Sequence, residues 1–213
     1  MPQPLSPSTQ GKVTELRGRY HDILSFSNTF HPNRTETFAA HPTRCITGGA
    51  PPLVHLRLAY GDGAPIQWLT AHLATWQEKL NVPNKMSASE IESCAHTIAN
   101  DFYFLKTTEI MLFLAQLLGG KYSVEWHGHI LSSTIITTLK ERFMPWRIRV
   151  IEECEEEAKR QKELEDRKRN PPMSYDEWKK QKESNEVCLS VAPVSPPPSR
   201  QTDLSPTSFG SHT

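Results

Sequence analysis

Two histidines separated by one glycine, His127 and His129, are the first residues in this chain whose type and spacing suggest chemistry, and Glu125 lies close to them. Imidazole and carboxylate groups bind metal ions, but a zinc or iron site needs one or two further ligands at a fixed geometry. The chain contains no HExxH, CxxC or paired DxD motif that would supply them. We therefore expect a turn with solvated histidines here, and we predict no metal site.

The sequence Gly119-Gly120-Lys121 superficially resembles a phosphate-binding loop. A P-loop needs GxxxxGK[ST] between a strand and a helix, whereas these glycines follow a helical pattern and Tyr122 replaces the Ser or Thr. The GxSxG motif of a nucleophile elbow is missing as well. Cys94 lies on the apolar face of a predicted helix, where a small buried thiol is expected. We predict no catalytic residue, no cofactor and no enzymatic activity.

Basic and aromatic side chains alternate around residues 121–128 and along the segment that follows. Such a mixture can hold a phosphate backbone through its cations and stack bases on its rings. The alternative is that Tyr122 and Trp126 cap the core while the charges belong to an ordinary surface, and the sequence alone favours this plainer interpretation. The candidate nucleic-acid-binding residues are Lys106, Lys121, Tyr122, Trp126, Lys140, Arg142, Arg147 and Arg149.

The composition sets limits on the class of protein. Lys and Arg total 24, as do Asp and Glu, so no global basic field attracts nucleic acid or anionic membrane. The four cysteines are far apart, which argues against a disulfide framework or a zinc ribbon. No apolar leader segment opens the chain, and the longest apolar run, residues 110–118, is too short to span a bilayer. We expect a cytoplasmic protein with reduced thiols and no membrane partner.

The middle of the chain, residues 51–150, predicts a small all-α domain. Residues 65–80 carry apolar side chains at helical spacing, and Ser87 with Glu90 forms a capping box that begins the next helix. Thr107 is the expected cap of an apolar helix over residues 108–118, which should form the centre of the core. Residues 53–60 suit either a strand or a short helix, and we favour the helix because no partner strand of comparable quality exists nearby.

A short aromatic crossover, a β-turn or hairpin over residues 121–128, should follow the Gly119-Gly120 stop. The next helix begins at Ser132 or Ser133 and continues to Phe143. Pro145 lacks the N–H that would bond to Glu141, so we expect a kink or a restart there.

The ends of the chain are more polar. At the N-terminal side we predict disorder over residues 1–10, a helix over 11–27 and a long loop over 28–50, where His-Pro steps and Gly48-Gly49 occur. Beyond the domain we predict a projecting charged helix over 151–170, a short capped helix over 171–183 and a disordered tail over 184–213. A capping box at Ser174 and Glu177 begins the short helix, and its Tyr175 and Trp178 are the candidate residues for binding a protein partner through residues 173–182.

Residues 61–147 resemble an uncharacterised bacterial protein family that is associated with mobile elements and phages of gut-type bacteria. The resemblance lies in YGDGAPIQWL, in LNVPNKMSASEIESCAHTIANDFYFLKTTEIMLFL and in GGKYSVEWHGHILSSTIITTLKERF. This chain has Ser123 where the family pattern has glycine, and Trp126 where tyrosine is commoner. The resemblance implies a domain of unknown function and a setting in mobile elements, and it implies no activity.

Two functional hypotheses follow from these observations. The first is a non-enzymatic, nucleic-acid-associated accessory protein of a mobile element or replication system, with DNA or replication proteins as partners. The second is an adaptor that recruits a protein through the charged helix and the helix that carries Tyr175 and Trp178.

Overall fold

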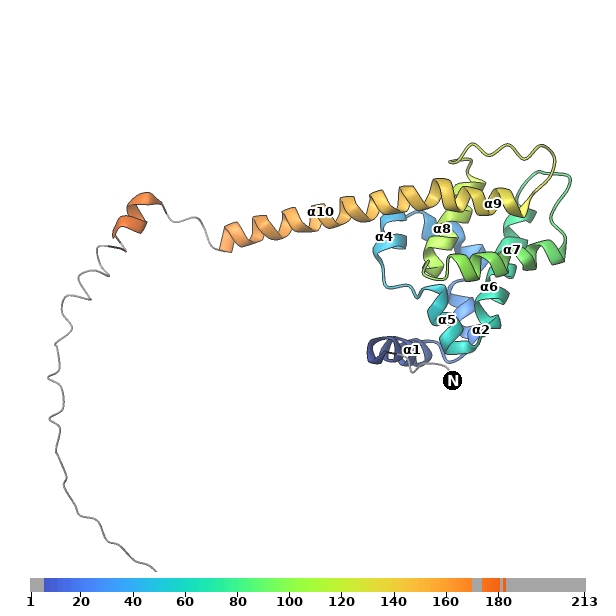
Figure 1. The fold of residues 1–213 in the computed structure, drawn as a ribbon, viewed down its shortest axis with the longest axis horizontal. Helices are drawn as coiled ribbons and strands as arrows, with labels where there is room; N and C mark the ends of the chain where they lie inside the picture. Colours follow the sequence, from blue (N-terminus) through green and yellow to red (C-terminus); the bar gives the residue numbers. More distant parts are fainter. Residues whose placement is uncertain (1–5, 170–173, 181, 183–213) are drawn as a thin grey trace, which may run out of the picture. The chain divides into compact units, whose positions relative to one another are not determined.

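The computed structural model describes residues 6–169, 174–180 and 182. Over these residues the chain is all-α, as predicted: it contains helices and turns but no β-strand, and pairing is limited to two isolated bridges, Pro52 with Lys106 and Asn84 with His129 (Figure 1). The chain divides into two units, one ending at Arg160 and one starting at Gln161. The boundary falls inside α10, Met144–Arg169.

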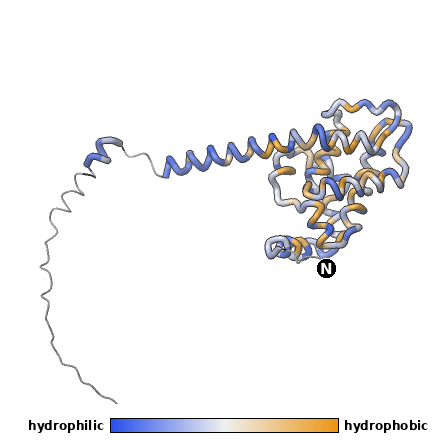
Figure 2. Tube along the Cα trace, in the orientation of Figure 1, coloured by the Kyte–Doolittle hydropathy of each residue, from blue (hydrophilic) through white to orange (hydrophobic). Residues whose placement is uncertain are grey.

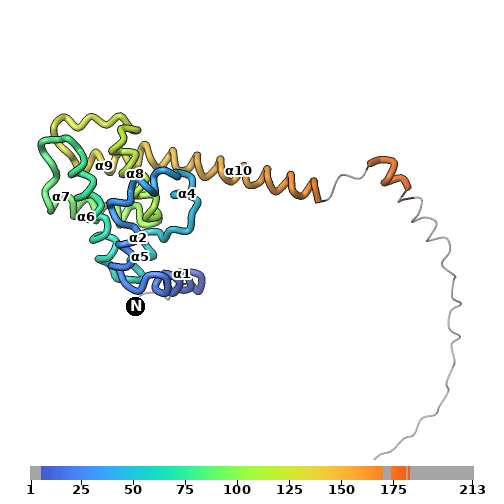
Figure 3. Tube along the Cα trace, turned by 180° about the vertical axis from the view of Figure 1, so that it is seen from behind, coloured from blue at the N-terminus to red at the C-terminus, as the bar shows by residue number. Residues whose placement is uncertain are grey.

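Helix α8, Thr107–Leu118, is the centre of the first unit. Its first eight residues, 107–114, are all buried, which fits a helix that is apolar on nearly every face. The helices α3 (Thr35–Ala39), α4 (Pro42–Thr47) and α6 (Gly63–Glu78) pack against it, and Figure 3 shows α4 beside α8. The cap differs from expectation, because Lys106 occupies the N-cap position and the Glu109 carboxylate accepts its backbone N–H at 2.8 Å.

Helices α6 and α7 (Ala88–Asp101) pack against each other, and α9 (Ser132–Thr138) packs on α7. The apolar stripe of α6 is buried through Leu69, Leu73 and Trp76. The predicted capping box is present: Ser87 Oγ accepts the Glu90 N–H, and the Glu90 carboxylate accepts the Ser87 N–H at 2.7 Å. Hydrophobic periodicity and capping together therefore identified this part of the core.

The ambiguous segment of residues 53–60 is the helix α5, Leu53–Tyr60. It packs against α6 and against α1, Pro7–Arg19. Arg17 Nε donates to the Ala59 carbonyl at 2.9 Å, and the Tyr60 hydroxyl donates to the Tyr20 carbonyl at 2.6 Å. Two polar contacts therefore attach α1 to the C-terminal end of α5.

The N-terminal predictions need correction. Helix α1 begins at Pro7, so the predicted disorder over residues 1–10 is wrong for residues 7–10, while residues 1–5 lie outside the described part. The predicted helix over 11–27 is two helices, because the chain breaks after α1 and α2, Ile23–Thr29, begins anew. Asp22 explains the break: its carboxylate accepts the Ser25 N–H at 2.7 Å, which caps a new helix.

The predicted loop over residues 28–50 is also wrong, because most of it is short helix. A 3₁₀ turn η1 (Pro32–Arg34) runs into α3, and α4 follows at Pro42. Both His-Pro steps begin a helix, since proline at the first helical position loses no intrahelical hydrogen bond. Cys45 and Ile46 of α4 are buried in the common core, which stabilises a helix too short to form alone.

The crossover after α8 consists of turns, and the hairpin alternative is wrong. Four residues have positive φ, two of them non-glycine: Gly120, Ser123, His127 and Gly128. The backbone here pairs with the loop after α6 instead, since Asn84 N donates to the Gly128 carbonyl at 3.2 Å and Ile130 N donates to the Asn84 carbonyl at 3.0 Å. The expected irregularity near Pro145 is present as a π-helical segment, η2, Leu139–Phe143, which separates α9 from α10.

The second unit contains the rest of α10 and a helical segment over residues 175–180. The charged helix predicted over 151–170 belongs, as far as Arg169, to α10, which begins earlier, at Met144; Asn170 lies outside the described residues. Residues 155–169 are all exposed, and Figure 2 shows their hydrophilic character. The predicted tail over 184–213 and residues 171–173, 181 and 183 of the predicted capped helix lie outside the described residues.

Candidate functional site

Four of the candidate nucleic-acid-binding residues gather around one pocket of about 320 Å³. Lys121 and Tyr122 come from the connection between α8 and α9, Arg142 comes from η2 and Arg149 from α10. Ser123 and Trp146 complete the lining. Arg142, Trp146 and Arg149 are spaced by four and three residues, so they lie on one face of the continuous helical segment. The connection between α8 and α9 therefore places Lys121 beside Arg142 and Arg149 on this face. We call Lys121, Arg142 and Arg149 the cation triad.

The members of the cation triad are all exposed. Among the described residues, none of the three has a carboxylate within 4.0 Å. Acidic residues lie nearby in sequence, because Glu141 precedes Arg142 and Glu152 follows Arg149 by three positions. The positive potential of the cation triad is therefore confined to its immediate surroundings. Three guanidinium and ammonium groups without acidic partners are suited to bind an anion.

The aromatic groups beside the cation triad are already in use. The Lys121 ammonium lies 3.5 Å from the centroid of the Trp146 ring, a cation–π contact that covers one face of the indole. Partial burial lowers the pKa of Lys121. The Tyr122 hydroxyl is hydrogen-bonded to Gln116 Oε1, and its ring packs 5.9 Å from Phe113. Burial raises the pKa of the Tyr122 hydroxyl. Tyr122 therefore caps the core, and the site offers cations for phosphate contact rather than open rings for base stacking.

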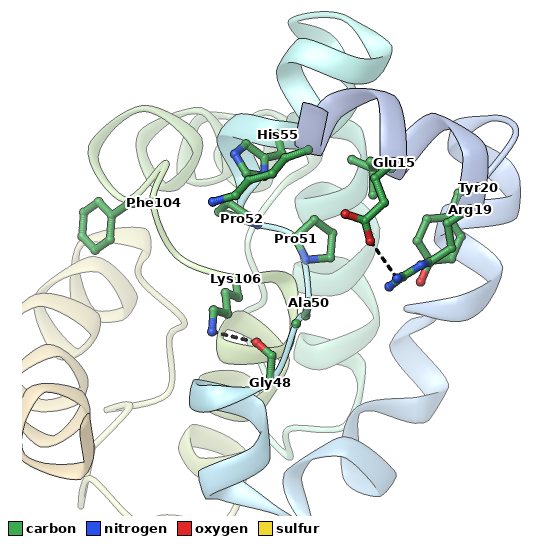
Figure 4. Close-up of a pocket in the computed structure, with 13 residues that line it drawn as sticks. Glu15, Arg19, Tyr20, Gly48, Ala50, Pro51, Pro52, His55, Phe104 and Lys106 are labelled. Atoms are coloured by element: carbon green, nitrogen blue, oxygen red, sulfur yellow. Dashed lines mark hydrogen bonds and ion pairs between the residues drawn. The ribbon is translucent and has the colours of Figure 1, made fainter. Parts of the chain in front are cut away.

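Two other candidates, Lys106 and Arg147, are structural. Lys106 Nζ donates to the Ile46 carbonyl at 2.5 Å and to the Gly48 carbonyl at 2.8 Å, the second bond being visible in Figure 4. Burial lowers the pKa of Lys106, an effect that the Glu109 charge opposes. Arg147 Nε donates to Glu109 Oε1 at 2.7 Å, and Glu109 has no solvent exposure. Both cations are therefore committed to partners inside the first unit, and neither lines the pocket of the cation triad.

Trp126 and Lys140 also lie outside that pocket. The Trp126 ring makes an edge contact with Trp76 at 5.6 Å, and Trp126 is half-buried. This geometry supports the interpretation of Trp126 as a cap on the core. Lys140 is exposed on η2. Lys140 therefore carries a positive charge but does not line the pocket that Lys121, Arg142 and Arg149 share.

The two histidines lie beside one carboxylate and one amide side chain. His127 Nε2 lies 3.6 Å from Glu125 Oε2, with side-chain exposures of 80% and 82%. His129 Nε2 lies 3.5 Å from Asn84 Nδ2. Within residues 6–169, 174–180 and 182, no group of three or more His, Cys, Asp or Glu is arranged to hold a metal ion.

The candidate partner residues lie in the second unit. The predicted capping box forms, because the Glu177 carboxylate accepts the Ser174 N–H at 3.0 Å and Ser174 Oγ accepts the Glu177 N–H at 3.2 Å. The rings of Tyr175 and Trp178 stack at 5.9 Å and remain 74% and 49% exposed. Lys182 Nζ lies 5.3 Å from the Trp178 centroid. The segment presents a preformed aromatic pair on a capped helix.

Two residues important for the site were not identified from the sequence. Trp146 lies one helical turn after Arg142, and the signal for it was that spacing. Glu109 is an acid inside the most apolar helix of the chain, which signals a buried partner of opposite charge.

Comparisons with protein-family models, with curated protein sequences and with solved structures found no match to this chain. None of the described helices is both long enough and apolar enough to cross a membrane.

Proposed function

We propose that this protein is a non-enzymatic, nucleic-acid-associated accessory protein that holds the phosphate backbone through the cation triad. The observation that carries the proposal is the convergence of Lys121, Arg142 and Arg149 on one pocket without carboxylate partners in the described part. Phosphate oxygens are the acceptors that such cations bind, and such contacts carry no sequence information. Binding is therefore expected to be independent of sequence.

The setting that we propose is a mobile element or a replication system, with DNA or replication proteins as partners. Support for it comes from the resemblance of residues 61–147 to proteins of phages and mobile elements. The proposed compartment is the cytoplasm, which suits the free thiols of Cys45, Cys94 and Cys154, because disulfides are rare there.

The salt dependence of binding tests this proposal quantitatively. Three phosphate contacts predict a slope of log K against log salt of about −2.7 for duplex DNA, so affinity should fall about 40-fold between about 50 mM and about 200 mM salt. Fluorescence anisotropy with a labelled duplex and a labelled single strand gives both affinity and slope. Each alanine variant of the cation triad should weaken binding to all sequences alike and reduce the slope by about 1.

Lys140→Ala is the matched control, because Lys140 is an exposed cation on the same helical segment but outside the pocket. It should change affinity less than about twofold. No binding at about 50 mM salt would refute the proposal. A triple Lys121→Ala, Arg142→Ala, Arg149→Ala variant that binds like the unmodified chain would refute it equally, provided that circular dichroism shows both proteins folded.

A second candidate function, an adaptor, rests on the stacked and exposed rings of Tyr175 and Trp178. A capped helix with an aromatic pair can fill a groove on a protein partner. Affinity purification with and without nuclease separates the two functions. A partner that survives nuclease and is lost in Tyr175→Ala/Trp178→Ala, but not in Leu164→Ala, would favour the adaptor. Leu164 is a suitable control because it is an exposed apolar residue of the same unit, at 54% exposure.

A further inference from the structure

The segment Gly48–Pro51, which connects α4 with α5, is a wall shared by two further pockets of the first unit. One pocket, of about 480 Å³, includes Lys12, His55 and Phe104 (Figure 4). The other, of about 520 Å³, includes Phe38, Arg44 and Cys45. Each volume lies in the range of small-molecule sites.

Two cations of the pocket in Figure 4 are in use. The Lys106 ammonium donates to two backbone carbonyls, and Arg19 pairs with Glu15 at 3.0 Å. Glu15 itself lines this pocket, so an acidic group lies beside the remaining basic groups, Lys12 and His55.

The second pocket has a different charge pattern. Arg19, His41 and Arg44 contribute to its lining, and no acidic residue does. The described contacts of Arg44 and His41 include no ion pair with a carboxylate. Arg34 adds positive charge nearby, with its guanidinium 5.6 Å from the Phe38 centroid. An anionic group is therefore the ligand chemistry that this rim favours.

Aromatic side chains form the apolar part of the same pocket. Phe30 and Phe38 stack at 5.6 Å with an interplanar angle of 22°, and Tyr20 meets Phe30 at 6.0 Å. Two polar groups of the lining are hydrogen-bonded internally: Cys45 Sγ donates to the Phe38 carbonyl at 3.1 Å, and Thr108 Oγ1 donates to the Cys45 carbonyl at 2.7 Å. The aromatic face of this pocket is thus apolar. Arg19 pairs with Glu15, so Arg44 and His41 are the basic groups of the rim without a carboxylate partner in the described part of the chain.

We propose that this pocket binds a small amphipathic anion, a molecule with an apolar ring system and one carboxylate, sulfonate or phosphate group. The ring system contacts the aromatic wall of Tyr20 and Phe38, and the anionic group lies at Arg44 and His41. The site shares no residue with the cation triad, so the two can be tested separately.

Two fluorescent probes with one ring system provide the test on the full chain. Anilinonaphthalene sulfonate carries the anionic group, and N-phenylnaphthylamine lacks it. The sulfonate probe should bind saturably at one site, about tenfold more tightly than the neutral probe, because a charge-assisted contact is added. Arg44→Ala should remove most of this difference while leaving the neutral probe unchanged.

Lys12→Ala is the positional control, because Lys12 lines only the neighbouring pocket. It should leave the affinity for the sulfonate probe within about twofold of the original. Circular dichroism of each variant must match the parent, since these probes also bind partly folded chains. Equal affinity for both probes, no binding of either, or unchanged binding in Arg44→Ala would each overturn the proposal. An equal loss in Lys12→Ala would overturn the assignment to this pocket.

Discussion

The ion pair between Glu109 and Arg147 makes a strong prediction about stability. Glu109 is fully buried and the Arg147 side chain is 17% exposed, with 2.7 Å between Oε1 and Nε. The second carboxylate oxygen of Glu109 accepts the backbone N–H of Lys106. The change Arg147→Met keeps the apolar stem and removes the charge. It leaves a carboxylate in the core with one hydrogen bond and without its paired cation, with only the more distant Lys106 charge nearby. This should lower the free energy of unfolding by about 3–5 kcal/mol.

Urea unfolding followed by far-ultraviolet circular dichroism measures this change at an unchanged m-value. Arg149→Met, two residues further along α10 and exposed, is the matched control and should stay within about 0.5 kcal/mol of the parent. The double variant Glu109→Gln/Arg147→Met should recover much of the loss, because glutamine keeps an oxygen for Lys106 N–H without the charge. Recovery should be incomplete, since the amide nitrogen would lack a partner.

A loss below about 1 kcal/mol in Arg147→Met would show that the pair does not hold α10 to α8. A double variant no more stable than the single one would refute the assignment of the effect to buried charge. The result also bears on function, because a reduced affinity of an Arg147 variant for DNA would reflect lost folding rather than a lost phosphate contact.

Two further predictions concern buried titratable groups. Burial lowers the pKa of His72 from 6.5 to about 4, so the unfolded chain binds the extra proton first. The contribution of neutral His72 to the free energy of unfolding should be fully present above about pH 6.5, and up to about 3 kcal/mol of it should be lost as the pH falls to about 4. A His72→Gln variant whose free energy of unfolding in urea has the same pH slope would contradict this. Burial also raises the pKa of Cys45 to about 11 and that of Cys94 to about 12. Peptide mass mapping after alkylation at about pH 8 should therefore show Cys154 modified in the native protein and the two buried thiols modified only in urea, and native labelling of Cys94 at the rate of Cys154 would refute their protection.

The elements that could be predicted from the sequence are those whose stability depends on local signals. The apolar stripe of residues 65–80 and the capping box at Ser87 and Glu90 define α6 and α7 whether or not their neighbours are known. Residues 28–50 have no such stripe, and their short helices depend on burying Cys45 and Ile46 against α8. Proline at the first helical position is a local signal for these helices, but the same residue type is also common in loops.

The crossover at residues 121–128 could not be assigned because its pairing is non-local. Its long-range backbone bonds, at Gly128 and the adjoining Ile130, go to Asn84, which follows α6 and lies far away in sequence. A hairpin would instead have required two adjacent strands in register, and the positive φ values of Ser123 and His127 show a chain that turns repeatedly. Ser123 occupies a left-handed conformation that glycine adopts at lower cost.

Residue type and spacing cannot separate a cation that binds a ligand from one that holds the fold, because both are basic side chains near aromatic ones. The two kinds of cation are distinguished by whether the side chain already has a hydrogen-bond acceptor within the protein. Lys106 and Arg147 donate to carbonyl and carboxylate oxygens within the protein, whereas the Lys121 ammonium lies on the Trp146 ring and has no hydrogen-bond acceptor among the described residues. Glu109 indicates the difference from the sequence. It lies in a helix too apolar to leave a carboxylate unpaired, so a basic residue must lie beside it. Arg147 is that partner, so this basic residue contributes to the fold and is not available to nucleic acid.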